Sequence, residues 1–216
     1  MAYSMVKAAT STIPIVGSYL SEILATIITP PLEKRREAWF NELATNLGTL
    51  QEKGQVDFEK LAENTVFIDT IIRATTYALQ TGDEKKLEAF RNFVVNTALI
   101  ENPKAVKISL YLAKIDNMTS WHIGILLLLD APKDFLEKIN FFYTTNNELS
   151  LRGFIFLVFP DMKEEGKIVE GIWEDLRKWG FHDCGDWASI GTQGFKLEQM
   201  TTVQGREFVW FLSNNV

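Results

Sequence analysis

Apolar residues recur every three or four positions along most of the chain, which is the spacing of amphipathic helices. The first such stretch covers residues 13–29, and a charged stretch with the same spacing follows from Pro31 to residue 53. Proline lacks the N–H that a helix interior needs, so Pro30-Pro31 predicts a break with a second helix beginning at Pro31. The apolar stripe of the first helix consists of Ile13, Val16, Leu20, Ile23, Leu24, Ile27 and Ile28.

Four more helical patterns follow, at residues 57–80, at 83–99, after Pro103 and from 119 to 129. Short polar turns join them, which indicates an antiparallel bundle. The side chains of Asp57, Asp83 and Thr119 or Ser120 are suited to cap helix starts. In residues 57–80 the apolar positions form a broad surface, so a central helix is expected. They are Phe58, Leu61, Ala62, Phe67, Ile68, Ile71, Ile72, Ala78 and Leu79.

The last hundred residues have a different pattern. Helices are expected at 133–142 and 168–179, and a closing helix is expected to enter through Thr201 or Thr202. Residues 149–159 fit either a buried strand or a short buried helix, and periodicity does not decide between them. Residues 195–200 can form a strand.

This order of helices around the glycine-rich stretch 191–194 resembles a winged-helix module. The predicted fold is therefore mainly α. Residues 1–116 form a helical bundle with an apolar N-terminal helix, and residues 117–216 form a winged-helix-like α+β module.

The charge balance argues against nucleic acid as a partner. The chain has a net charge of −6, and residues 117–216 hold nine basic against fourteen acidic residues. Nucleic-acid phosphates attract clustered Lys and Arg and repel an acidic surface. Protein contacts are therefore expected of the winged-helix-like module, and a nucleic-acid-linked regulator is the last alternative.

The apolar stretch 13–29 is too short and too polar to predict a membrane span. It has 17 residues and contains Glu22, whereas a spanning helix needs about 20 mainly apolar residues. Packing in the protein core is the leading interpretation; an oligomer seam and a membrane-surface helix are the alternatives. The adjacent Lys34, Arg35 and Arg36 fit either an anionic surface or a solvated face with local ion pairs such as Glu33–Arg36. A cytoplasmic location is expected, with membrane association as the alternative.

Catalytic patterns are weak. The chain has two histidines, His122 and His182, and one cysteine, Cys184, and it lacks the usual zinc, phosphate-loop and nucleophile spacings. His182-Asp183-Cys184 with Asp186 could be imagined as a metal or thiolate site, but adjacent residues of one loop rarely converge on one ion. We therefore predict no catalytic, cofactor-binding or metal residues, no cofactor, and a non-enzymatic protein.

The candidate contact residues come from three places. Four tryptophans gather in the tail, where a core role is favoured and an exposed ring would mark a contact site. The candidates are Ile13, Val16, Leu20, Leu24 and Ile27 of the first helix, Lys34, Arg35 and Arg36 of the basic run, and Trp187 of the tail.

Three short segments in the middle of the chain have a distinctive residue pattern. They are Arg91-Asn92 with Asn96-Thr97-Ala98-Leu99, Met118-Thr119 with Ile123 and Ile125-Leu126, and Asp130-Ala131-Pro132. These segments resemble the abortive-infection alpha family of bacterial proteins, and the resemblance transfers no functional residue. It implies a role in phage defence. The predicted function is thus a bacterial interaction protein that assembles with itself or a protein partner; a membrane-acting effector that inserts its first helix is the alternative.

Overall fold

The structure, a computed structural model, describes residues 16–140, 150–185, 187 and 197–216, with the backbone alone for residues 16–28 and 30. Helices dominate these residues, and their extended backbone forms one isolated bridge, between His182 and Thr201. The prediction of a mainly α protein is confirmed. The α-helices are α2 (Val16–Glu52), α3 (Phe58–Glu63), α4 (Thr65–Gln80), α5 (Glu84–Ala98), α6 (Ala105–Asn117), α7 (Ser120–Asp130), α8 (Pro132–Lys138), α9 (Leu151–Val158), α10 (Gly166–Lys178) and α11 (Val203–Leu212), and η1 (Pro160–Met162) is a 3₁₀ helix.

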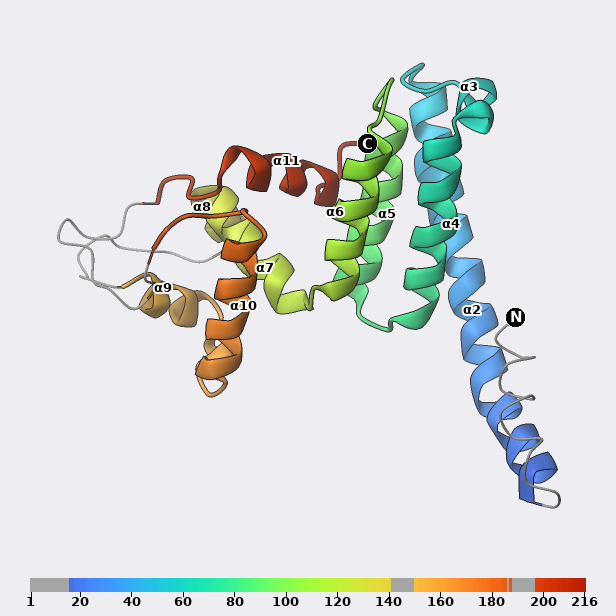
Figure 1. Cartoon of the computed structure of the whole chain (residues 1–216), viewed down its shortest axis with the longest axis horizontal. Coiled ribbons are helices and arrows are strands. Elements are labelled where there is room, and N and C mark those ends of the chain that lie inside the picture. Colours follow the sequence, from blue (N-terminus) through green and yellow to red (C-terminus); the bar gives the residue numbers. More distant parts are fainter. Residues whose placement is uncertain (1–15, 141–149, 186, 188–196) are drawn as a thin grey trace.

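Helix α2 is one continuous helix of 37 residues, so the predicted break at Pro30-Pro31 is wrong. Proline fixes φ near −65°, which is itself a helical value. The two prolines therefore remove two N–H donors from the helix without forcing the backbone out of it. Figure 1 shows the consequence: the amino half of α2 continues past the ends of α4 and α5.

Local capping chemistry sets most helix starts as predicted. The side chains of Asp57, Asp83, Thr119 and Thr202 accept backbone hydrogen bonds at the starts of α3, α5, α7 and α11. Residues 57–80 form two helices instead of the one expected. Asn64 ends α3 in an extended conformation, and its side-chain oxygen accepts from the Phe67 N–H (3.1 Å) to begin α4.

The regular elements described in the carboxyl-terminal part are all helices. Residues 149–159, which fitted a strand or a helix, contain α9. Residues 197–200 form no strand, and the glycine-rich stretch 191–194 lies outside the described residues. The winged-helix part of the fold prediction therefore stays a prediction.

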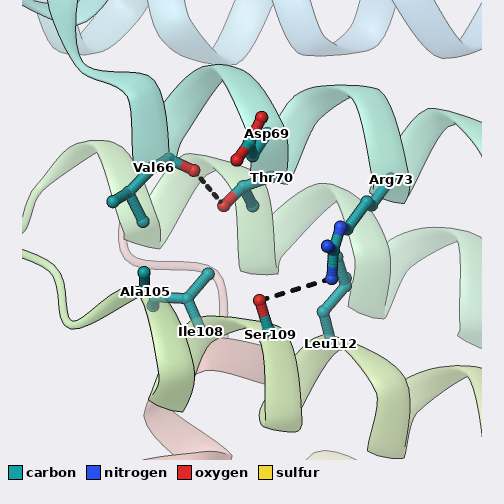
Figure 2. Close-up of a pocket in the computed structure, with 8 residues that line it drawn as sticks. All are labelled: Val66, Asp69, Thr70, Arg73, Ala105, Ile108, Ser109 and Leu112. Carbon is teal, nitrogen blue, oxygen red and sulfur yellow. Dashed lines mark hydrogen bonds between the residues drawn. The ribbon is translucent and has the colours of Figure 1, made fainter.

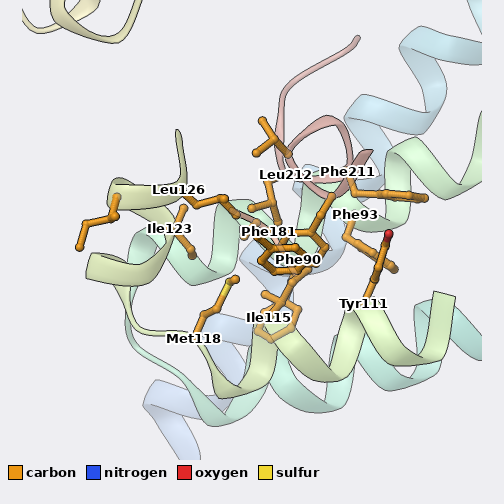
Figure 3. Packing of buried hydrophobic residues seen from close by; sticks show 14 of the residues in the cluster. Phe90, Phe93, Tyr111, Ile115, Met118, Ile123, Leu126, Phe181, Phe211 and Leu212 are labelled. Atoms are coloured by element: carbon orange, nitrogen blue, oxygen red, sulfur yellow. The ribbon is translucent and has the colours of Figure 1, made fainter. Parts of the chain in front are cut away.

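Helix α5 is the centre of the molecule and packs on α2, α4, α6, α7 and α11. The side chains of Phe90, Phe93 and Val94 on this helix are fully buried. Figure 3 shows the aromatic cluster that α5 builds with α6 and α11, in which Phe93 stacks on Phe211 with ring centroids 4.8 Å apart. This packing joins α11 to the first half of the chain, across the predicted domain boundary at residue 116.

Candidate interaction surface

The most unusual feature of the fold is the projecting part of α2, residues 16–31, which we call the α2 extension. The guanidinium of Arg35 donates to the Leu79 carbonyl (3.0 Å), and the indole of Trp39 donates to the Thr75 hydroxyl (2.9 Å). These bonds show that α2 and α4 are antiparallel and that α4 ends level with Arg35. The sixteen residues of the extension therefore lie beyond α4 and span about 24 Å at about 1.5 Å per residue.

The α2 extension carries the predicted apolar contact residues except Ile13, which lies outside the described residues. Val16, Leu20, Leu24 and Ile27 lie within its helical backbone. Glu22 is its only charged residue. Neither α4 nor α5, on which the rest of α2 packs, continues beside this segment (Figure 1).

The three basic residues after the extension have different environments. Arg35 is half-buried and caps the carboxyl end of α4 through the Leu79 carbonyl. Arg36 is exposed and lies 3.9 Å from Glu33, which is the local ion pair expected from the sequence. Lys34 is exposed. The basic run is therefore partly structural, and two of its three charges face solvent.

A second apolar surface lies beside α2 on the body of the molecule. We call it the α2–α4 face and define it by Phe40, Phe58, Ile68 and Ile72, which are 43%, 46%, 38% and 59% exposed. Phe40 follows Trp39, the residue that contacts Thr75, and Ile72 and Ile68 lie one and two turns before Thr75 on α4. The Phe58 N–H donates to the Gln51 side chain (3.1 Å), which places the start of α3 beside the carboxyl end of α2.

The prediction of a central helix over residues 57–80 is therefore wrong, because Phe58, Ile68 and Ile72 are exposed. Helix α4 has neighbours on part of its circumference only, and it buries Phe67, Ala74 and Ala78. An apolar pattern that runs around a helix does not reveal which side lacks a neighbour. The only sequence signal for this face was the excess of apolar positions beyond what one stripe requires.

Trp187 is buried, with 5% of its surface exposed. Its ring lies near those of Trp173 and Phe156, with centroids 6.4 and 5.7 Å away. This tryptophan contributes to the core of the carboxyl-terminal part and offers no exposed ring for a partner.

His182 and Cys184 form a hydrogen-bonded structural turn. The His182 Nδ1 accepts from the Cys184 N–H (3.4 Å), so its Nε2 carries the proton and donates to the Trp173 carbonyl (3.0 Å). The Cys184 thiol donates to the Met200 carbonyl (3.5 Å), and burial raises its pKa to about 11. A protonated thiol beside a histidine with both nitrogens in use is a poor nucleophile.

His122 is also held in one tautomer. Its Nδ1 accepts from the Thr119 N–H (3.1 Å) in a capping box at the start of α7, which leaves the proton on Nε2. This Nε2 lies 3.8 Å from the Asp175 carboxylate and has no hydrogen-bond partner among the described residues. Burial lowers the pKa of His122, and the negative charge of Asp175 opposes part of that shift.

We expect the protein to lose stability as the pH falls below about 6.5. Burial lowers the pKa of both His122 and His182 from 6.5 in the folded state, so the unfolded chain binds protons that the folded chain resists. The free energy of unfolding is highest above pH 6.5. Below that pH it falls by up to about 1.4 kcal/mol per pH unit for each histidine, until the pH reaches the folded-state pKa of that histidine. Urea denaturation at pH 7.5, 6.5 and 5.5 measures the slope. His122→Gln keeps a capping-box residue and removes one titration, so an unchanged slope in this variant would contradict the assignment.

A small polar depression lies between α4 and α6. Its empty volume is about 250 Å³, part of which is open solvent. Figure 2 shows Arg73 reaching across it to the Ser109 hydroxyl (3.3 Å), with Asp69 and Thr70 on the α4 side. Binding pockets for small molecules have volumes of about 300–1,000 Å³ and are mainly apolar. An open depression already bridged by its own side chains is a weak candidate for a ligand site.

The described residues were also searched for metal sites and for membrane-spanning helices. Within the described part of the chain, no three His, Cys, Asp or Glu side chains gather as a metal site requires. None of the described helices combines the length and the apolar content needed to cross a bilayer. Comparisons with protein-family models, curated proteins and solved structures give no match for this chain.

Proposed function

We propose that this protein is a non-enzymatic interaction protein that works by self-assembly, with the α2 extension as its contact element. One observation carries the proposal: α2 continues as a helix for sixteen residues beyond the two helices on which it packs. Apolar surface exposed to water is unfavourable by about 25 cal/mol per Å². An apolar helix that projects from the body is therefore stabilised when another surface covers it.

We expect the full-length protein to form oligomers whose mass exceeds the 24.6 kDa of one chain. The double variant Leu24→Glu/Ile27→Glu should be monomeric, because it places two charges on the apolar stripe of the extension. Ser18→Glu, on the polar side of the sequence pattern, is the matched control and should assemble like the natural chain. Sedimentation velocity over a concentration series measures all three, and a monomeric natural chain at every concentration would overturn the proposal.

A membrane-acting effector is the second candidate function. The observation in its favour is the position of two exposed cations, Lys34 and Arg36, directly after the apolar extension. In this case the full-length protein should float with vesicles of phosphatidylethanolamine and phosphatidylglycerol, and Leu24→Glu/Ile27→Glu should not. Absence of flotation for the natural chain would dispose of this candidate.

Two finer proposals concern the context of assembly. The similarity of residues 91–132 to the abortive-infection alpha family supports a role in phage defence. The order of α7, α10 and α11 supports a winged-helix-like module in residues 117–216 that makes protein contacts. The acidic balance of this module weighs against a nucleic-acid-linked regulator.

A further inference from the structure

The α2 extension and the α2–α4 face have matching lengths. The extension spans about 24 Å, and α4, which carries Ile68 and Ile72, has 16 residues and spans the same distance. Both surfaces lie along α2, one after the other. Because α2 is a continuous helix, the extension of a chain cannot fold back onto the α2–α4 face of the same chain.

We propose that the α2 extension of one copy lies along the α2–α4 face of a second copy, and that the second copy returns the same contact. This inference rests on the proposed self-assembly and names the surface that receives the extension. The two α2 helices run antiparallel about a two-fold axis near the point where the extension meets the body. Such an interface is self-complementary and closed, as in most soluble homo-oligomers.

The charges around the α2–α4 face agree with an apolar occupant. Asp69 and Arg73 are the only charged residues of α4, and both line the depression on the side of α6. On α2, Glu42 pairs with Arg91 of α5 and is therefore directed away from α4. Glu33 and Arg36, two turns and one turn before Phe40 on α2, also border the face, and they pair with each other (3.9 Å). An apolar helix therefore approaches the face beside charges that already have partners.

The area of the contact favours the reciprocal arrangement over pairing of the two extensions alone. A helix about 24 Å long and about 10 Å wide covers roughly 240 Å² of the surface beneath it. Two reciprocal contacts, each with two buried surfaces, give about 1,000 Å² in total, which is the lower limit for a specific interface. A single extension–extension contact gives about half of that area.

The first test substitutes exposed residues of the face. Ile72→Glu and Phe40→Glu should each raise the dimer dissociation constant roughly tenfold or more, because the change occurs twice in the dimer. Val106→Glu and Val203→Glu are matched controls, since these valines are 74% and 73% exposed on other surfaces. The controls should leave the constant within about twofold. Far-UV circular dichroism checks that each variant folds.

The second test mixes two defective variants. Leu24→Glu/Ile27→Glu has a damaged extension and an intact face, whereas Ile72→Glu has the reverse. Mixing should produce a heterodimer, held by the intact extension of one chain on the intact face of the other, that binds roughly tenfold or more tightly than either homodimer. If the extensions pair with each other instead, mixing the two variants gives no heterodimer that is tighter than the homodimers.

The outcomes separate this inference from the proposed function. If Leu24→Glu/Ile27→Glu abolishes assembly but Ile72→Glu and Phe40→Glu behave like Val106→Glu, or if mixing gives no heterodimer, the receiving surface is wrong and self-assembly stands. A natural chain that is monomeric throughout overturns both. Loss of assembly in the face variants together with recovery on mixing establishes the reciprocal contact.

Discussion

Replacing Gly205 by alanine is expected to destabilise the protein by about 3 kcal/mol or more. A Cβ at this position would lie 2.2 Å from the Phe181 carbonyl oxygen. That oxygen accepts the Thr202 N–H (2.9 Å) at the start of α11, so neither backbone segment can move without breaking this bond. His182, which follows Phe181, and Thr201, which precedes Thr202, form an isolated β-bridge that joins the same two segments. Urea denaturation followed by tryptophan fluorescence measures the loss.

Gly171→Ala is the matched control for this prediction. Gly171 lies in the middle of α10, and a Cβ there meets nothing within 4 Å. Alanine is favoured over glycine in a helix interior by about 1 kcal/mol, so this variant should be more stable than the natural chain. Equal effects of the two substitutions would mean that the close approach of α11 to Phe181 is absent.

The features that sequence reasoning predicted correctly are local in the chain. Asp57, Asp83, Thr119 and Thr202 cap helices that begin one residue later, and capping depends on a side-chain oxygen within three residues of the N–H that it accepts. Gly54 and Gly180 follow α2 and α10 with φ of 68° and 76°, as helix-ending glycines do. These interactions form between near neighbours, so the sequence contains all the information that they need.

The features that sequence reasoning missed depend on which segments of the chain meet in space. The exposure of Ile68 and Ile72 follows from the absence of a neighbour on one side of α4, and no local pattern records that absence. The hydrogen-bond partner of His182 is the Trp173 carbonyl, nine residues away, and no local pattern identifies this partner. For the candidate contact site, the apolar and basic residues of α2 were identified, but Phe58, Ile68 and Ile72 of the α2–α4 face were placed on a central helix.

The second large effect is expected at Asn96, which is fully buried between α5 and α11. Its amide nitrogen lies 2.8 Å from the Ser213 carbonyl oxygen and 2.9 Å from that of Trp210, and Asn92 donates in the same way to Leu212 (2.7 Å). The last turn of α11 contains no basic residue, so these two amides satisfy carbonyls that the helix cannot. Asn96→Ala should cost about 2–3 kcal/mol, because it removes the hydrogen bonds by which a fully buried amide holds the end of α11.

Asn96→Asp should be more damaging than Asn96→Ala at pH 7, by about 1 kcal/mol or more, because it directs a buried carboxylate at carbonyl oxygens. Burial and these oxygens would hold the introduced carboxyl in its neutral form, so its folded pKa would exceed the usual value of about 3.9. The penalty should therefore grow as the pH rises above that value and shrink at pH 5, where a protonated carboxyl can donate one bond.

Urea denaturation of both variants at pH 7 and pH 5 tests this order. Asn117→Ala, which removes an exposed amide bonded to the Ala113 carbonyl (2.7 Å), should change stability by no more than about 0.5 kcal/mol at either pH. A penalty for Asn96→Asp that does not depend on pH would contradict the proposed contact with the end of α11.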